Sequence, residues 1–289
     1  MKSVTAVVTT YHREPYVVQQ ALSSIAEQTY PIKQIILIDD NEDGNQLSSR
    51  IQEVCGQYRN TVYIKQNGNQ GACTARNLGI CHAEGEFVAF LDDDDQWMPE
   101  KIEKQIKVFE ENDSSVGLVF CSGIVLDEKT GIRSDYYNYG LKKDITFADM
   151  IVRDYVGSTS NPLIRKTCFD VVGGFWTDQP ARQDYEMWLR ISTKFRLLGI
   201  DEKLFIYSIH SGDQITKDDK KSYIGFKNIY RRYKKGYVSN PRARIDMLNV
   251  IIRGRDRITP EILMFWLERQ CVQVMYGLPR DVEDERWQV

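Results

Sequence analysis

The chain has 289 residues, of which 42% are hydrophobic and 27% charged, and its formal net charge is −3. This composition is sufficient for the core of one large domain, or of one domain with an appendage. The near-neutral charge gives no sign of a nucleic-acid partner. Six scattered cysteines without a C-x-x-C pair favour a reducing compartment, and three histidines argue against a histidine-rich zinc site.

The N-terminus enters a strand-like segment at residues 4–9 without a charged region before it, and no apolar stretch approaches 18 residues. This pattern predicts neither a cleaved signal peptide nor a membrane-spanning helix. We therefore expect a cytoplasmic protein, and contact with the inner face of the cell membrane stays open.

Strand-like and helix-like segments alternate over the first 125 residues. The expected strands are 4–9, 34–39, 61–65, 87–91 and 116–126, and the expected helices are 15–28, 74–82 and 99–111. Alternation with fully apolar strands predicts an α/β fold, in which helices flank a mostly parallel central sheet.

The rest of the chain is less regular. Residues 130–215 contain short aromatic and glycine-rich segments, a helix expected at 184–194 and strands expected around 195–210. Ten basic residues against two acidic ones follow between 227 and 257, and then a helical apolar segment at 262–267. Basic residues interleaved with tyrosines suit an anionic membrane surface or a lipid-diphosphate acceptor, so we predict membrane contact through residues 219–270. The alternative is the solvated face of a helical appendage.

Four consecutive aspartates, Asp92 to Asp95, follow the apolar strand at 87–91. Adjacent like charges repel and need a cation. Mg²⁺ or Mn²⁺ takes oxygen ligands and shares them with substrate phosphates, and ligands of α/β sheets bind at the carboxyl ends of strands. The cluster predicts a metal-assisted site for phosphate groups, with a solvated acidic turn as the alternative. Asp39 and Asp40 end another strand, and Asp39 could accept hydrogen bonds from a nucleobase or a ribose, or cap the next turn.

Three further segments carry candidate chemistry. Gly71 opens a helix whose free N–H groups and Arg76 could bind a phosphate, although an arginine there is often a surface residue. Asp184 and Glu186 lie at a helix start, where a carboxylate acts either as a cap or as a general base. His210 follows a late strand and could reach a metal or a phosphate oxygen, or be structural.

The combined motifs resemble glycosyltransferase family 2 over residues 3 to 212. They are Val7-Val-Thr-Thr-Tyr-His-Arg-Glu-Pro15, Ile36-Leu-Ile-Asp-Asp40, Gly71 with Ala75-Arg-Asn-Leu-Gly79, Leu91-Asp-Asp-Asp-Asp95 with Trp97 and Pro99, Gly173-Gly-Phe175, and Asp184-Tyr-Glu-Met-Trp-Leu-Arg190. The resemblance implies a GT-A-type, Rossmann-like fold, a nucleotide-sugar donor, Mn²⁺ or Mg²⁺, and inversion at the anomeric carbon.

Site roles come from the resemblance, position by position. Thr9, Tyr11 and Asp39 match positions that hold the base, Arg76 matches the pyrophosphate contact, and Asp93 matches the ribose position. The expected donor-binding set is Thr9, Tyr11, Arg13, Asp39, Gly71, Arg76, Asp92 and Asp93. Asp94 matches the metal ligand; Asp95 is the alternative because four aspartates leave the register open, and His210 is a further candidate. Asp184 matches the catalytic base, with Glu186 as the alternative because Gln183 replaces the usual acidic residue.

The resulting hypothesis is that the protein transfers one hexosyl or N-acetylhexosaminyl unit from a nucleotide-sugar, with a UDP-sugar as the first candidate donor. The acceptor would be a glycan or lipid-linked saccharide in bacterial surface glycan assembly. A catalytic domain at 1–215 would comprise a nucleotide-sugar half, about 1–125, and an acceptor half, about 126–215; residues 216–289 would form a helical extension. The alternatives are a non-catalytic nucleotide-sugar-binding scaffold and a sugar-phosphate nucleotidyltransferase, whose usual glycine-rich N-terminal loop is missing here. No G-x-G-x-x-G follows the first strand, which excludes a dehydrogenase.

Overall fold

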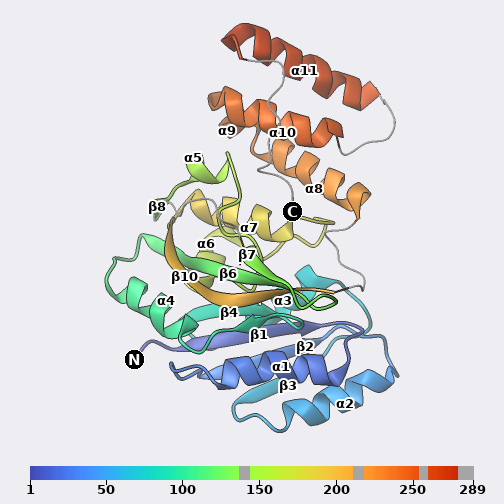
Figure 1. Cartoon of the computed structure of the whole chain (residues 1–289), viewed down its shortest axis with the longest axis vertical. Helices are drawn as coiled ribbons and strands as arrows, with labels where there is room; N and C mark the ends of the chain where they lie inside the picture. Colours follow the sequence, from blue (N-terminus) through green and yellow to red (C-terminus); the bar gives the residue numbers. More distant parts are fainter. Residues whose placement is uncertain (137–143, 211–217, 254–259, 279–289) are drawn as a thin grey trace. The chain divides into compact units, whose positions relative to one another are not determined.

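The computed structural model describes residues 1–136, 144–210, 218–253 and 260–278 (Figure 1). The chain forms two compact units. The first comprises Met1–Thr146, Tyr155–Thr177 and Arg190–Ser211, and the second comprises Phe147–Asp154, Asp178–Leu189 and Gly212–Val289.

One mixed sheet forms the centre of the first unit, with the strand order β3-β2-β1-β4-β9-β6-β10-β5. β3, β2, β1 and β4 pair parallel, and so do β6 and β10. β9 runs antiparallel between β4 and β6. The strands are β1 Val4–Thr10, β2 Gln34–Asp39, β3 Thr61–Lys65, β4 Phe87–Asp92, β5 Gln96–Trp97, β6 Val116–Asp127, β7 Arg133–Tyr136, β8 Asp144–Ile145, β9 Leu163–Arg165 and β10 Arg196–Ile209.

Helices cover both faces of this sheet, as the apolar strands predict. Ile35 and Leu37 of β2 pack in the cluster that contains the buried side chains of α1 and α2, whereas Ile36 and Ile38 pack with Ala75 of α3. The helices of this unit are α1 Pro15–Ala26, α2 Gln46–Cys55, α3 Ala72–His82, α4 Lys101–Glu110 and α6 Thr167–Val172. The predicted α/β fold with a central sheet flanked by helices is confirmed.

Several short elements were not expected from the sequence, and α2 and β9 are the two that matter most for the sheet. α2 is largely polar, and only Ile51, Val54 and Cys55 are buried; the Asn45 side chain caps it by accepting from the Leu47 amide at 2.9 Å. β9 has three residues and is too short for a periodic pattern. Its antiparallel insertion makes the sheet mixed, as do the antiparallel strands β5, β7 and β8.

Helices build the second unit: α5 Phe147–Met150, α8 Asp219–Arg232, α9 Lys234–Ser239, α10 Pro241–Arg253 and α11 Pro260–Tyr276; α7 Gln183–Ser192 begins in this unit and ends in the first. Glutamates neutralise much of the basic stretch found in the sequence. Glu261 pairs with Lys227 and Arg231, and Glu268 pairs with Lys234 and Arg244. These ion pairs attach α11 to α8 and α10. Across the described residues, no helix is both long and apolar enough to cross a membrane.

A close approach of α3 to β1 generates a prediction. A Cβ atom on Gly79 would lie 2.3 Å from Val7 Cγ1, so Gly79→Ala overpacks this contact. We expect a loss of about 1–3 kcal/mol in the free energy of unfolding, measured by urea denaturation. Adding Val7→Ala should recover part of the loss by making room. Gly56→Ala is the control, because its Cβ would meet only backbone oxygens at 3.4 Å or more; an equal loss there would refute the packing explanation.

Candidate active site

Strand register brings the first candidate residues to one edge of the sheet. Thr9 lies opposite Asp92, and Thr10 lies opposite Asp39, because β1 pairs parallel with both β4 and β2. The carboxyl ends of all three strands therefore meet, as the sequence predicts for a ligand site in an α/β sheet.

Arg13 lies against the centre of the aspartate cluster. Its Nε donates to Asp93 Oδ1 at 3.0 Å, and its Nη2 donates to Asp94 Oδ2 at 2.8 Å. Arg13 comes from the loop after β1, and its side chain is only 23% exposed. One guanidinium thus compensates two carboxylates in a partly desolvated place, where charged hydrogen bonds are strong.

His210 follows β10 and joins the same group. Its Nε2 lies 2.7 Å from Asp94 Oδ2 and 3.1 Å from Arg13 Nη1. An Nε2–H that donates to Asp94 leaves this nitrogen without a lone pair for Arg13, so one ring tautomer satisfies only one of the two contacts.

Asp92 has a different set of partners. Arg76 Nη2 donates to its Oδ1 at 2.8 Å, and the Thr159 hydroxyl lies within 3.1 Å of both carboxylate oxygens. The Arg76 guanidinium also lies over the Phe175 ring, 5.6 Å from its centroid. α3 therefore delivers Arg76 to the acidic cluster, as the sequence predicts for a phosphate-binding arginine near the carboxylates.

Asp95 is buried in hydrogen bonds to two other segments. Its Oδ2 accepts from the Ser160 hydroxyl at 2.6 Å, and its Oδ1 accepts from the Ser208 amide at 2.9 Å. Ser160 Oγ also accepts from the Asp92 amide at 3.0 Å. Asp95 thus connects the turn after β4 to β10 and to the loop before β9, and its use as an alternative metal ligand stays a prediction.

Burial changes the protonation of two members of the cluster. Burial raises the pKa of Asp93 to about 7, against the opposing effect of Arg13, and the charge of Asp94 adds to the rise. Burial also raises the pKa of Asp95 well above its ordinary value, with the charges of Asp94 and Asp92 acting in the same direction. The cluster contains more negative charge than its protein partners compensate.

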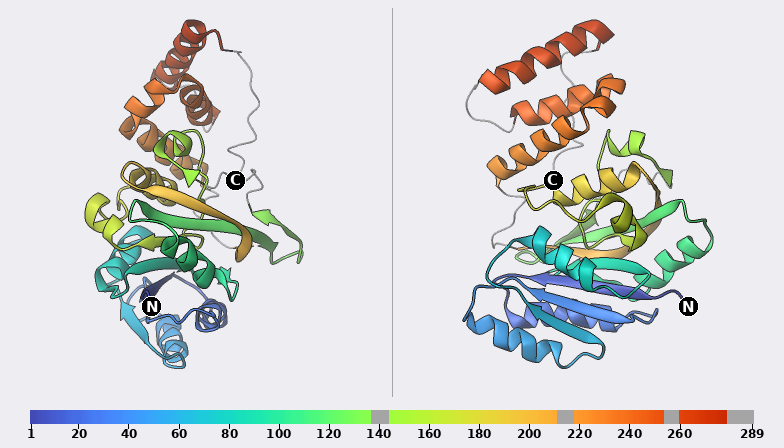
Figure 2. Two further views of the ribbon diagram at one scale, coloured as in Figure 1. Left: turned by 90° about the vertical axis from the view of Figure 1, so that its left-hand side faces the viewer. Right: turned by 180° about the vertical axis from the view of Figure 1, so that it is seen from behind.

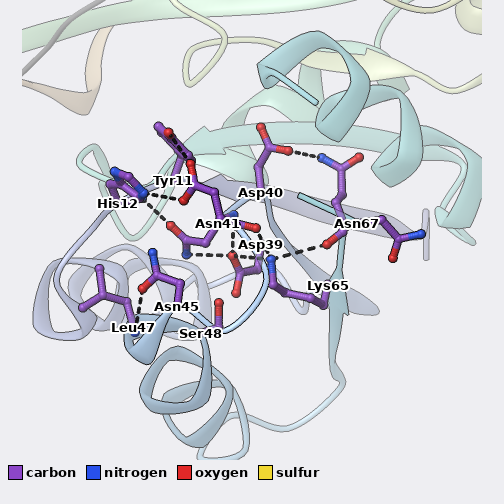
Figure 3. A network of polar contacts seen from close by, with 12 residues as sticks. Tyr11, His12, Asp39, Asp40, Asn41, Asn45, Leu47, Ser48, Lys65 and Asn67 are labelled. Atoms are coloured by element: carbon purple, nitrogen blue, oxygen red, sulfur yellow. Dashed lines mark hydrogen bonds and ion pairs between the residues drawn. The ribbon is translucent and has the colours of Figure 1, made fainter. Parts of the chain in front are cut away.

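Asp39 and Asp40 organise the adjoining loops (Figure 3). Asp39 is fully buried; its Oδ1 accepts from the backbone and side-chain N–H groups of Asn41 at 2.8 and 2.7 Å, and its Oδ2 accepts from the Tyr63 hydroxyl at 2.5 Å. Asp40 Oδ2 accepts from the Gly71 amide at 2.8 Å. Gly71 has a φ of 86° and begins α3, so Asp40 fixes the turn that positions this helix. Contact of Asp39 or Gly71 with a nucleotide stays a prediction.

Tyr11 is exposed beside this network. Its ring stacks on His12 with centroids 4.1 Å apart, and its hydroxyl donates to Glu42 Oε1 at 2.8 Å. Hydrogen bonds from the Glu42 backbone, His12 and Tyr11 lower the pKa of Glu42 to about 2. An exposed aromatic ring that neighbours already hold in place is suited to stacking on a base.

The two candidate bases lie in the second unit, in the first turn of α7. Asp184 is partly buried, and its Oδ1 accepts from the Tyr185 amide at 2.8 Å. Glu186 is 1% exposed and accepts from Arg232 Nη1 at 2.9 Å and from the Tyr233 hydroxyl at 3.1 Å. Glu186 is thus a buried carboxylate held by an ion pair, and the choice between the two as catalytic base stays a prediction.

Sequence reasoning missed the buried loop that supports the aspartates. Residues 156–161 are all buried, and Thr159 and Ser160 contact Asp92 and Asp95 as described above. Asn161 contributes further by bonding both the amide and the carbonyl of Cys121 in β6. A run of small polar residues, Gly157-Ser-Thr-Ser-Asn161, was the available signal.

Asp94 and His210 supply the donor atoms best suited to a metal. Carboxylate oxygen is the ligand that Mg²⁺ and Mn²⁺ prefer, whereas imidazole nitrogen is a typical ligand of transition-metal ions. Within the part of the chain that the structure describes, no group of three or more His, Cys, Asp or Glu side chains is arranged around one metal position. A metal here would therefore need oxygen atoms from a bound diphosphate or from water.

The sheet flanked by helices, with carboxylates and arginines at the carboxyl ends of its strands, is an α/β fold of GT-A type. The family model for "Glycosyl transferase family 2" matches residues 5–173, more than half of the chain. The chain belongs to glycosyltransferase family 2, and the resemblance seen in the sequence is confirmed.

Relatives and solved structures agree with this assignment. The putative teichuronic acid biosynthesis glycosyltransferase TuaG of Bacillus subtilis is 28% identical over 241 residues, covering 79% of this chain and 88% of TuaG. The Escherichia coli "UDP-Glc:alpha-D-GlcNAc-diphosphoundecaprenol beta-1,3-glucosyltransferase WfgD" is 25% identical, covering 87% and 93%. The Pyrobaculum calidifontis mannosyltransferase PcManGT, solved with GDP-Man and Mn²⁺, shares the fold with a TM-score of 0.65 at 15% identity, covering 96% of this chain and 84% of that one.

The raised pKa of Asp93 generates a pH prediction. A carboxyl with a higher pKa in the folded than in the unfolded chain binds more protons when folded, so its contribution to stability falls as pH rises from about 4 to about 7. Asp93→Asn should therefore make the free energy of unfolding less dependent on pH across this window, measured by urea denaturation in EDTA. Asp43→Asn, an exposed aspartate outside the cluster, is the control. An unchanged slope in Asp93→Asn would show that Asp93 titrates normally.

Proposed function

We propose that the protein is an inverting, metal-dependent glycosyltransferase that moves one hexosyl or N-acetylhexosaminyl unit from a nucleotide-sugar to an acceptor hydroxyl. The observation that carries the proposal is the placement of two arginines against Asp92–Asp94. Arg13 bonds Asp93 and Asp94, and Arg76 bonds Asp92. Guanidinium groups bind phosphate oxygens bidentately, and carboxylates beside them can share a divalent ion with the same phosphates.

The donor would bind along the carboxyl ends of β1, β2 and β4. Tyr11 would stack on the base, Thr9 and Asp39 would lie beside it, and Asp93 would face the ribose. Arg13, Arg76 and the N-terminal end of α3 at Gly71 would face the diphosphate. A UDP-sugar is the first candidate donor, in line with the name of WfgD; the GDP-Man bound to PcManGT makes a GDP-sugar the alternative to test.

Asp94 and His210 would hold Mn²⁺ or Mg²⁺, with Asp95 as the alternative ligand. When bound, the metal supplies positive charge next to the diphosphate, which becomes more negative as the glycosidic bond breaks. The concentration of carboxylates around Asp94 and the position of His210 Nε2, 2.7 Å from Asp94 Oδ2, support this role. PcManGT, a structural neighbour with bound Mn²⁺, is consistent with it.

Asp184 would act as the general base. It would remove the proton from the acceptor hydroxyl as the oxygen attacks the anomeric carbon on the face opposite the leaving diphosphate, which gives inversion without a covalent intermediate. The helix dipole at the start of α7 stabilises a carboxylate at this position. Glu186 is the alternative, but its ion pair with Arg232 gives it a structural partner already.

A glycan or lipid-linked saccharide is the acceptor that we propose. The name of WfgD describes a sugar on a diphosphoundecaprenol carrier, and that of TuaG describes teichuronic acid biosynthesis. Together they support a role in assembling a bacterial surface glycan at the cytoplasmic face of the membrane. The division into a catalytic domain at 1–215 and a helical extension at 216–289 remains part of the proposal.

The base assignment predicts a selective loss of catalysis. Asp184→Asn should lower turnover about 10²–10⁴-fold and leave nucleotide affinity unchanged, because the change removes proton transfer only. Turnover is read as nucleotide diphosphate release from the sugar nucleotide selected by a screen of UDP- and GDP-sugars. Glu186→Gln is the matched variant, and a greater loss there than in Asp184→Asn would reassign the base. Nucleotide binding without any diphosphate release by the wild type would favour the non-catalytic scaffold.

The metal assignment predicts that substitution of Asp94 weakens nucleotide binding only when a divalent ion is present. Asp94→Asn should weaken UDP binding in Mn²⁺ about tenfold or more, and it should bind UDP like the wild type in EDTA, as measured by calorimetry. Asp43→Asn is the charge-matched control. If Mn²⁺ and Mg²⁺ do not strengthen binding of UDP or GDP by the wild type, metal dependence is refuted.

A further inference from the structure

α11 is the outermost helix of the stack formed by α8, α10 and α11 in the second unit (Figure 1 and Figure 2). Its buried side includes Ile262, Phe265 and Val272. At 100° per residue, the opposite side of the helix is also apolar. Six exposed residues lie on it: Leu263, Met264, Leu267, Cys271, Val274 and Met275.

This second apolar side, which we call the outer face of α11, is large for a surface exposed to water. Leu263 and Leu267 are 48% and 50% exposed, Met264 and Met275 are 68% and 67% exposed, and Val274 is 78% exposed. Together the six side chains present on the order of 600 Å² of apolar surface, the upper end of what an ordinary monomer leaves in one patch. A helix that is apolar all round is normally buried on both sides, so the outer face indicates a second apolar surface that covers it.

The charge of the surrounding segment favours one occupant. Residues 218–278 contain thirteen basic and six acidic residues, a net charge of +7 in a chain whose total is −3. The two glutamates of α11 are already neutralised by ion pairs to α8, α9 and α10. In the described residues, Lys235, Arg242 and Arg253 form no ion pair and are at least partly exposed.

A second copy of the chain would bring another +7 toward the first, and like charges at a contact oppose association. An anionic lipid surface instead combines opposite charge with an apolar interior. Trp266, at the edge of the outer face, is 42% exposed, and tryptophan side chains prefer the boundary between headgroups and acyl chains. With 17 residues, α11 is shorter than the ~20 that a membrane-spanning helix needs, so it would lie on the bilayer.

We propose that the outer face of α11 inserts into the headgroup region of an anionic membrane, with the positive charge of residues 218–278 attracting the lipid. The structure sharpens the membrane contact expected from the basic sequence. Four of those basic residues (Lys227, Arg231, Lys234 and Arg244) hold α11 in place through ion pairs with its glutamates, and the apolar contact comes from a helix side that is not basic. Membrane binding would benefit catalysis by giving access to a lipid-linked acceptor, and this benefit rests on the proposed function. Binding of α11 to the membrane does not depend on that function.

Vesicle sedimentation tests the proposal. The wild type should bind vesicles of phosphatidylcholine mixed with phosphatidylglycerol, and high salt or pure phosphatidylcholine should weaken binding. Leu267→Glu and Val274→Glu each place a charge in the outer face and should reduce binding about tenfold or more. Val171→Glu makes a similar change at a 57% exposed residue of the first unit and should bind like the wild type. UDP affinity, measured in parallel, shows whether each variant is folded and tests the donor site separately.

A fluorophore reports the same contact directly. Cys271 lies in the outer face, and Cys81 is exposed in the first unit. A polarity-sensitive label on Cys271, in a Cys81→Ser chain, should shift to the blue with anionic vesicles, and a label on Cys81, in a Cys271→Ser chain, should not. No binding to anionic vesicles, or full binding by both glutamate variants, would overturn the proposal. A dimer that Leu267→Glu dissociates, without vesicle binding, would overturn it too and assign the face to a second copy.

Discussion

The negative charge of Asp92–Asp95 at the end of β4 is the constraint on which the first unit depends. Four adjacent carboxylates at a partly buried strand end are stable only if separate partners compensate each of them. The compensation comes from distant parts of the chain: Arg13 from the loop after β1, Arg76 from α3, Ser160 from the loop before β9, and the Ser208 amide from β10. The hydrogen bonds that compensate the aspartates therefore also hold these four segments together. In this way the cluster of carboxylates organises the site.

The four aspartates are not compensated to the same extent. Asp95 accepts from a neutral donor on each oxygen and connects two segments of the chain, whereas Asp93 and Asp94 share the guanidinium of Arg13. Burial raises the pKa of Asp93 to about 7, and the charge of Asp94 acts in the same direction, so additional positive charge beside these two carboxylates would be stabilising. Carboxylates that were fully compensated by protein groups would gain nothing from an added positive charge. A ligand that brings phosphates needs cations, and a cation that would neutralise the aspartates needs further oxygen ligands, so metal and diphosphate would each supply what the other lacks.

Much of this arrangement could be predicted from the sequence, for identifiable reasons. Apolar strands that end in carboxylates identify the sheet edge, because the carboxyl ends of parallel strands coincide. The sequence predicts Arg76 near the start of a helix as a candidate phosphate ligand, but its ion pair with Asp92 is seen only in the structure. Partners that depend on tertiary folding could not be predicted: Thr159 and Ser160 lie in a loop without periodicity, and β9 is too short to show a pattern. The buried state of Asp39 was equally hidden. Its partner Asn41 is an ordinary polar neighbour two residues along the chain, and the Tyr63 hydroxyl meets it only when β2 and β3 pair.

The basic stretch near the C-terminus shows why charge counts alone mislead. In the sequence, Lys227, Arg231, Lys234 and Arg244 resemble a surface for anions, but in the structure these four residues neutralise Glu261 and Glu268. Their glutamate partners are on α11, outside the basic run, so the pairing is invisible until the helices pack. Two glutamates pair with these four cations, so the ion pairs cancel half of their positive charge. The net charge of the segment still acts over about a Debye length, ~8 Å at physiological ionic strength, so attraction and insertion are separate tasks. The first belongs to the excess of basic residues, and the second belongs to an apolar helix face that those ion pairs hold in place.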